Sequence, residues 1–299
     1  MKVISVTPRG YCKGVVNAIN IAKQTRDKYP NEPIYILGRL VHNKYVVEAL
    51  FDLNIITLDD LHKSRSELID CIDSGIVIFS AHGTSEEVYQ KARDKGLMII
   101  DATCNDVKKT QIIINEFLDN GYTVLYIGVK NHPESLSVLK KNSPIYLITS
   151  LDDINNLKLT TDKIMVINQT TMSINDIAYL HQQINKYYPF AIIYEEICSA
   201  TRVRQQAILN LEKVDLTYIV GDPNSNNTMN LVRLAKNNST KVCLIESVKD
   251  INIEDLININ KVAVTSGAST PTALTQQVID YLTNFQTEKN IPEITKAIL

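Results

Sequence analysis

Short apolar runs alternate with longer amphipathic stretches along the whole chain. Uninterrupted apolar runs are typical of parallel strands that are buried on both faces, and the stretches between them have helical spacing. The pattern therefore predicts an α/β protein. The clearest strand candidates are IYIL, IVIF, TVLYI, IMVI, LTYIV, KVCLI and KVAVT. The clearest helix candidates are NKYVVEALFDL, EEVYQKARDKG, DVKKTQIIINEFLDNG, NDIAYLHQQINKYY, ATRVRQQAILNLEK, TMNLVRLAKN and PTALTQQVIDYLTNFQ.

One strand–cysteine–helix pattern occurs three times, with Cys12, Cys104 and Cys198 at the junctions. The cysteines recur at intervals of roughly 93 residues, a period that indicates a repeated domain and is too long for a solenoid. We expect three small related αβ domains with parallel sheets. The predicted boundaries are 14–103, 104–197 and 198–285, with residues 1–13 completing the third domain and residues 286–299 forming a C-terminal tail.

Two further sets of polar loops follow the predicted strands, one set about 30 and the other about 70 residues after the cysteines. Ligands bind beyond the carboxyl ends of parallel strands, so these loops predict one central pocket. Several of the loops begin helices, where backbone N–H groups favour an anion. Their imidazole, hydroxyl and amide groups predict a phosphate site without a Walker-type loop or a dinucleotide glycine motif. The first of these sets contains His42, His132, Glu134 and Ser225 to Asn227. The second contains His82, Thr170 and Ser269.

The three repeated cysteines predict a metal centre. Three thiolates are one ligand fewer than a closed four-cysteine iron–sulfur site has, so one metal position would stay open for chemistry. The other two cysteines, Cys71 and Cys243, lie outside the repeat and are expected to be small core residues.

Composition and charge narrow the class of protein. A net charge of −2 and a pI near 6.2 argue against a nucleic-acid partner. No apolar run is long enough for a membrane span, so we expect no membrane partner. The segment MKVISVTPRGYC lacks the features of a secretory signal, and an odd cysteine count does not fit a disulfide framework. We therefore expect a cytoplasmic protein.

Nine loops together resemble those of a known family. RGYCKGVVNAI, LVHN, SAHGTS, DATC, NHPES, NQTT, ICSAT, NSNNT and SGAS resemble the signature loops of the 4-hydroxy-3-methylbut-2-enyl diphosphate reductase family, and the resemblance covers the chain up to the tail. In that family three αβ domains surround a [4Fe–4S] cluster in a pseudo-threefold arrangement. The resemblance implies reductive removal of an allylic hydroxyl, which yields isopentenyl and dimethylallyl diphosphate in the last step of the non-mevalonate pathway.

The resemblance also implies residue roles. Cys12, Cys104 and Cys198 would bind the cluster and leave one iron open. Glu134 would deliver a proton, with Thr170 as a substrate-binding hydroxyl relay, although the adjacent Thr171 leaves that register open. No flavin or nicotinamide site is visible, so we expect an external one-electron donor such as a ferredoxin or flavodoxin. The implied diphosphate-binding residues are His42, His82, His132, Ser225, Asn226, Asn227 and Ser269.

Two other readings remain open. An open-cluster dehydratase resembling quinolinate synthase would need arginines for dicarboxylate recognition, but the second and third loop sets contain only Arg39. A non-enzymatic iron–sulfur redox sensor would need neither Glu134 nor a set of phosphate donors.

Overall fold

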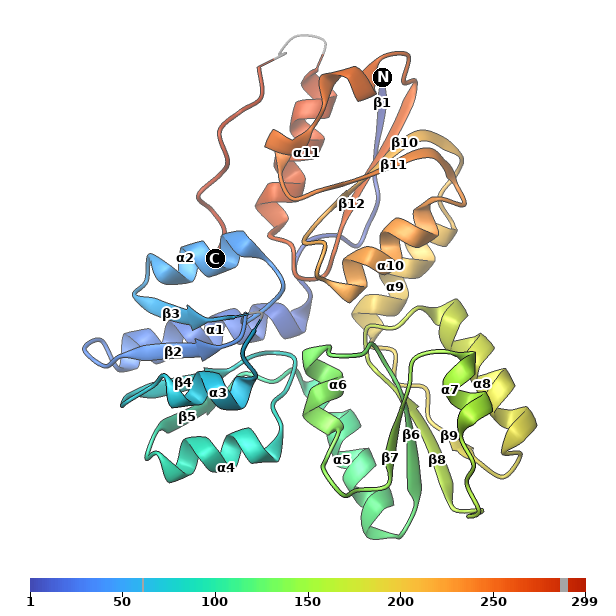
Figure 1. Ribbon diagram of the computed structural model, residues 1–299. Coiled ribbons are helices and arrows are strands. Elements are labelled where there is room, and N and C mark those ends of the chain that lie inside the picture. Colours follow the sequence, from blue (N-terminus) through green and yellow to red (C-terminus); the bar gives the residue numbers. More distant parts are fainter. Residues whose placement is uncertain (61, 286–289) are drawn as a thin grey trace. The chain divides into compact units, whose positions relative to one another are not determined.

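Three four-stranded parallel sheets make up the fold (Figure 1). The computed structural model describes residues 1–60, 62–285 and 290–299. The sheets have the orders β3-β2-β4-β5, β7-β6-β8-β9 and β11-β10-β12-β1, so corresponding strands occupy corresponding places. Every strand pair is parallel. The predicted α/β class with parallel sheets is confirmed.

The first sheet is formed by strands between residues 34 and 101. Its strand β4 is buried along its whole length, as the run IVIF predicts. Helices α3 and α4 pack against Leu37, Val77 and Phe79 of this sheet. A capping box between Ser64 and Glu67 begins α3. The elements of this repeat are α1 (Lys13–Lys28), β2 (Ile34–Leu37), α2 (Lys44–Phe51), β3 (Ile55–Leu58), α3 (Arg65–Asp70), β4 (Ile76–Phe79), α4 (Glu86–Asp94) and β5 (Met98–Asp101).

The second sheet has helices on both faces. Alternate residues of β6 contribute to two separate apolar clusters, one with α7 and α8 and the other with α5 and α6. Figure 1 shows these helix pairs on opposite sides of the green and yellow strands. The elements are α5 (Asn105–Asp119), β6 (Thr123–Ile127), α6 (Pro133–Val138), β7 (Ile145–Ile148), α7 (Leu151–Asn156), β8 (Ile164–Asn168), α8 (Ile174–Tyr187) and β9 (Ile192–Ile193).

The third sheet combines both ends of the sequence. Its strand β1 pairs with β12 in the register Lys2 to Lys261. One face packs on α11 and the other on α9 and α10. The elements are β1 (Lys2–Ser5), α9 (Ser199–Leu209), β10 (Val214–Val220), α10 (Asn226–Ala235), β11 (Ser239–Ile245), the 3₁₀ helices η1 (Val248–Asp250) and η2 (Ile253–Leu256), β12 (Lys261–Ser266) and α11 (Thr272–Asn284).

The chain divides into two units. The first unit contains Met1–Val16, Val41–Leu53 and Ser199–Leu299, and the second contains Asn17–Leu40 and Asn54–Cys198. The third sheet therefore lies in the first unit, and the other two sheets lie in the second. The three predicted domain boundaries and the pseudo-threefold arrangement stay predictions.

The predicted tail begins with residues 286–289, which lie outside the described residues. Residues 290–299 contain neither helix nor strand. The carbonyl of Ile298 accepts a hydrogen bond from the hydroxyl of Tyr11 at 2.8 Å, so the end of the tail lies beside the Cys12 loop. None of the described helices has both the length and the apolarity that a membrane span requires.

Candidate active site

Each repeated cysteine is fixed by the same backbone contact. In every repeat the cysteine N–H donates to a carbonyl in the loop that follows the third strand. Each cysteine also stands directly before or at the start of a helix, namely α1, α5 or α9. All three cysteines are half-buried, and none of them is in a disulfide. The donor and acceptor pairs are Cys12 with Ala268 at 2.9 Å, Cys104 with Ala81 at 3.0 Å, and Cys198 with Thr170 at 3.0 Å.

In the second unit, Glu134 and Thr170 form a buried pair. Oε1 of Glu134 accepts the backbone N–H of Thr170 at 2.7 Å, and Oε2 accepts its hydroxyl at 3.0 Å. Burial raises the pKa of Glu134 to about 7, and the two hydrogen bonds from Thr170 limit the increase. The structure thus brings together the predicted acid and the predicted relay, and leaves the acid able to hold a proton near neutral pH.

The fully buried side chain of Gln169 holds the two loops of this pair together. Its Oε1 accepts the N–H of Val129 at 2.9 Å and the hydroxyl of Ser135 at 3.3 Å. Its Nε2 donates to Oγ1 of Thr171 at 2.9 Å. Thr171 therefore binds Gln169, whereas Thr170 binds Glu134. Because this one amide binds groups on both loops, it fixes the position of Glu134 relative to Thr170.

His82 and His132 also lie together in the second unit. Their rings meet edge to face with centroids 5.8 Å apart. Nδ1 of His132 accepts the N–H of Glu134 at 3.1 Å, so the neutral ring carries its proton on Nε2. Nδ1 of His82 lies 3.5 Å from Oγ of Ser80, which accepts an N–H of Arg65 at 2.9 Å. The neutral ring of His132 is therefore an Nε2–H donor, which suits an anionic ligand, and the ring of His82 lies beside it.

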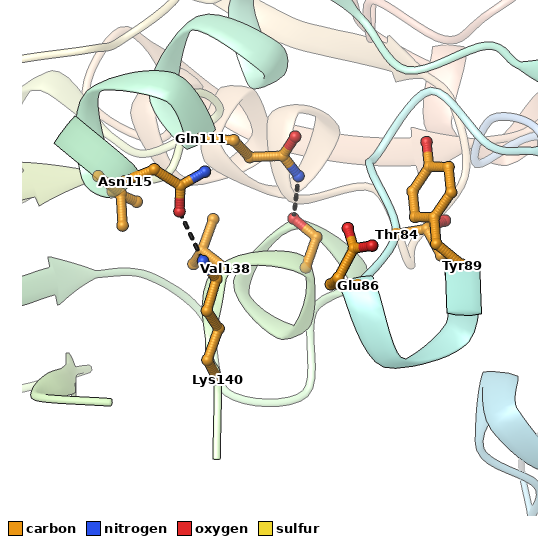
Figure 2. Close-up of a pocket in the computed structure, with 9 residues that line it drawn as sticks. Thr84, Glu86, Tyr89, Gln111, Asn115, Val138 and Lys140 are labelled. Atoms are coloured by element: carbon orange, nitrogen blue, oxygen red, sulfur yellow. Dashed lines mark hydrogen bonds between the residues drawn. The ribbon is translucent and has the colours of Figure 1, made fainter. Parts of the chain in front are cut away.

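A small cavity lies beside these loops in the second unit (Figure 2). Nε2 of Gln111 donates to Oγ of Ser137 at 3.0 Å, and that hydroxyl donates to the carbonyl of Glu134 at 2.7 Å. Gly83 has φ of +84°, and a Cβ there would lie 2.9 Å from Nε2 of Gln111. The His82 loop can therefore approach α5 and α6 this closely only because it has a glycine. The cavity measures about 160 Å³ and is lined by Thr84, Glu86, Tyr89, Gln111, Ile114, Asn115, Ser137, Val138 and Lys140.

In the first unit, the His42 loop contacts the Ser269 loop. The Ser269 hydroxyl donates to the carbonyl of His42 at 3.0 Å. Asn43, which sequence reasoning missed, is buried and caps α2 by accepting the N–H groups of Tyr45 and Val46 at 3.1 and 3.2 Å. The cap fixes where α2 begins and hence the direction of the His42 loop.

The Ser225 loop is held in the same unit. Ser225 caps α10 by accepting the N–H of Thr228 at 3.3 Å, and Asn226 is the first residue of that helix. The side chain of Asn227 is bound at both ends. Its Nδ2 donates to Oγ1 of Thr201 at 3.2 Å, and its Oδ1 accepts the N–H of Ala268 at 3.0 Å. This fixed amide connects the loops after β10 and β12.

Of the two cysteines outside the repeat, one is not buried as expected. Cys71 is exposed at the end of α3, so its prediction as a core residue is wrong. Cys243 is half-buried in β11 and packs against the core of the third sheet. Among the described residues, no group of three or more His, Cys, Asp or Glu side chains forms a metal site by itself. The three-cysteine ligand set stays a prediction.

Comparison with known proteins gives the family. A model of the LytB protein family matches residues 3–283. The chain belongs to the LytB protein family. It is 48% identical to the 4-hydroxy-3-methylbut-2-enyl diphosphate reductase of Bacillus cereus (strain B4264), in a match that covers 95% of this chain and 91% of that relative. It is 46% identical to the reductase of the same name from Anoxybacillus flavithermus, over 99% of this chain and 94% of the relative.

Solved structures of LytB-like reductases share the fold. The E-1-hydroxy-2-methyl-but-2-enyl-4-diphosphate reductase from Plasmodium falciparum matches with a TM-score of 0.87 and 31% identity, covering 98% of this chain and 95% of that one. A structure of (E)-4-hydroxy-3-methyl-but-2-enyl diphosphate reductase, the terminal enzyme of the non-mevalonate pathway, matches with a TM-score of 0.66 and 28% identity. That match covers 95% of this chain and 100% of the other chain.

Proposed function

We propose that this LytB-family protein is a 4-hydroxy-3-methylbut-2-enyl diphosphate reductase. It replaces the allylic hydroxyl of its substrate by hydrogen, using two electrons and two protons and releasing one water. Its products are isopentenyl and dimethylallyl diphosphate. The names of its relatives support this reaction. The observation that carries the proposal is the buried carboxyl of Glu134, which holds a proton near neutral pH and is hydrogen-bonded to Thr170.

The three repeated cysteines fit an iron–sulfur cofactor. Cys12, Cys104 and Cys198 are outside any disulfide and share one backbone contact. Each stands at a helix N-terminus, which favours the negative charge of a thiolate ligand. Together they would hold a [4Fe–4S] cluster and leave one iron without a protein ligand. The bound cluster would supply single electrons and a Lewis-acidic iron for the allylic oxygen.

The diphosphate is bound by uncharged donors. His132 offers its Nε2–H group, and His82 and His42 are the other two imidazoles. In the first unit, Ser225, Asn226, Asn227 and Ser269 belong to loops that are already held by hydrogen bonds. Binding at the diphosphate positions the distant allylic carbon, which is how remote contacts assist a reaction.

Glu134 supplies the proton that lets the hydroxyl leave as water. Its Oε1 faces a backbone N–H, which is always a donor, so the acidic hydrogen belongs on Oε2. In the protonated acid, Oε2–H donates to Oγ1 of Thr170, and the threonine hydroxyl then donates onward to the substrate oxygen. Thr170 therefore relays a proton without becoming charged itself.

Two electrons must enter from outside this chain. We infer a one-electron carrier of the ferredoxin or flavodoxin type as the donor. Cysteines that form no disulfide suit a reducing compartment, which supports a cytoplasmic location.

The proposed activity is tested on anaerobically purified, iron-loaded enzyme. With a chemical one-electron reductant, the enzyme should convert the hydroxylated allylic diphosphate to the two isomeric products, measured by mass spectrometry or NMR. Iron and sulfide content, measured on the same sample, checks the cofactor. Full cluster loading without turnover would point instead to a sensor or to a dehydratase acting on a different substrate.

A further inference from the structure

A guanidinium lies directly behind the His82 loop in the second unit. Arg65 is the first residue of α3, and its Nη1 donates to the carbonyl of Gly83 at 2.5 Å and to Oγ1 of Thr84 at 3.3 Å. Its Nη2 donates to Oγ of Ser80 at 2.9 Å, and Ser80 contacts the ring of His82. One arginine thus binds three of the six residues between β4 and α4.

The charge of Arg65 is not neutralised where it lies. Its three acceptors are uncharged, and it forms no ion pair with any residue in the described part of the chain. Asp59 acts on it only at longer range, and the carboxylate of Asp59 binds Arg39 at 2.9 Å. Burial lowers the pKa of Arg65 to about 10, so the group remains charged at neutral pH. A desolvated cation of this kind is costly unless an anion compensates it.

The loops on both sides make room for the guanidinium. Gly38, at the end of β2, has φ of +72°, and a Cβ there would lie 3.2 Å from Nη2 of Arg65. Arg65 therefore lies against the carboxyl ends of β2 and β4, which begin the His42 and His82 loops. A positive charge at this edge of the sheet raises the potential where a parallel sheet binds its ligand.

We propose that Arg65 is the positioning residue of the diphosphate subsite. It holds Ser80 beside the ring of His82, and it adds a positive charge behind the loop without touching the substrate. This inference rests on the proposed function, because it assumes that His82 faces a diphosphate.

Arg26 provides a matched control in the same unit. Its guanidinium also binds loop carbonyls, those of Tyr29, Pro30, Glu32 and Asn54. These residues precede β2 and β3, so they lie at the amino edge of the sheet, opposite to the His82 loop. Arg26→Gln therefore removes a guanidinium that also binds loop carbonyls, but it does so at the edge of the sheet where no ligand is expected.

The test measures binding of inorganic diphosphate to the iron-loaded enzyme by calorimetry, together with steady-state kinetics. Arg65→Gln should weaken diphosphate binding and raise KM about tenfold, because the subsite loses a nearby positive charge, while kcat changes less than about threefold. Arg65→Lys keeps the charge and should recover most of the affinity. Arg26→Gln should bind diphosphate like the wild type.

Three outcomes would overturn the inference. Wild-type affinity in Arg65→Gln would show that the charge is not used. An equal loss in Arg26→Gln would show a general effect on folding. Should Arg65→Gln fail to fold, Arg65→Met removes the same charge with an apolar side chain, and wild-type diphosphate affinity in that variant would equally overturn the inference. If the wild-type enzyme binds no diphosphate, the proposed function fails and this inference fails with it.

Discussion

The two units hold their predicted site residues in different ways. In the second unit, the ionisable side chains of Glu134, His82 and His132 contact neutral groups, namely Thr170, Ser80 and a backbone N–H. In the first unit, apart from His42, the predicted donors are amides and hydroxyls that are already bound to backbone or to other neutral groups. A carboxyl with a pKa near 7 exchanges its proton readily, and an amide does not. We therefore expect proton delivery to depend on the second unit, and changes to the polar donors of the first unit to affect binding.

Substitution of a repeated cysteine should have the same effect in both units. Cys12→Ser changes the first unit and Cys104→Ser the second, and each should lose most of the iron and the activity. Wild-type enzyme purified without oxygen should contain about four irons per chain. Iron and sulfide analysis with Mössbauer spectroscopy measures the loss. Cys71→Ser, at an exposed thiol outside the repeat, is the matched control and should retain the cluster. Full iron loading in Cys104→Ser would disprove the ligand assignment.

Removal of the acid should separate catalysis from binding. Glu134→Gln keeps the shape of the side chain but has no acidic proton. Turnover should fall at least about a hundredfold, the usual scale for general acid catalysis, while diphosphate affinity and iron content persist. Steady-state kinetics and calorimetry on the same preparation measure both. Near-wild-type turnover would show that another group delivers the proton.

The pKa of Glu134 predicts two pH effects. The acid acts when protonated, so kcat should fall as pH rises through about 7. The raised native pKa also means that the folded state binds the proton more tightly than the unfolded chain. The free energy of unfolding should therefore decrease as pH rises from 4.5 to about 7, by roughly 3 kcal/mol at most, and then level off. Glu134→Gln should lack both trends in kinetic and denaturant-unfolding measurements.

The sequence predicts regular, repeated features better than networks between loops. The strands IVIF and TVLYI were found because they are buried on both faces. Helices α3 and α6, with six residues each, were missed because they are too short to display helical periodicity. Missing α3 also hid Arg65. The Cys71 error has a related cause, since its apolar neighbours belong to this unrecognised helix and Cys71 ends it on the exposed side.

Within the site, the repeat pointed to the loops but not to their contacts. Glu134 and Thr170 stand in loops that the repeat singles out, and the structure joins them. Gln169 stands in the same loop as Thr170, yet its bonds to Val129 and Ser135 have no local sequence signature. Contacts between residues about 35 to 40 positions apart depend on tertiary packing, which periodicity alone does not specify.

Changes in the first unit should affect binding more than turnover. Asn227→Ala removes the amide that connects Thr201 and Ala268, so substrate affinity should fall about tenfold while kcat falls less. Asn227→Asp keeps the size and the acceptor for Ala268 but replaces a donor with a negative charge. It should therefore bind the diphosphate more weakly than Asn227→Ala does. A kcat decrease as large as that of Glu134→Gln, with unchanged KM, would erase the distinction between the units.

The smallest effect should come from the threonine next to the relay. Thr171 accepts a hydrogen bond from Gln169. The two hydrogen bonds to the carboxyl of Glu134 both come from Thr170. Thr171→Val should reduce stability by about 1 kcal/mol, because one buried amide donor loses its acceptor, and should reduce turnover less than about threefold. Thr170→Val has the same change in shape at the adjacent position and should lose most activity, since the proton path is interrupted. Comparing kcat and unfolding midpoints of the two valine variants tests the relay. If Thr171→Val were the more damaging to turnover, the proton would travel through the Gln169 side of the loop, and the assignment of Thr170 would have to be reversed.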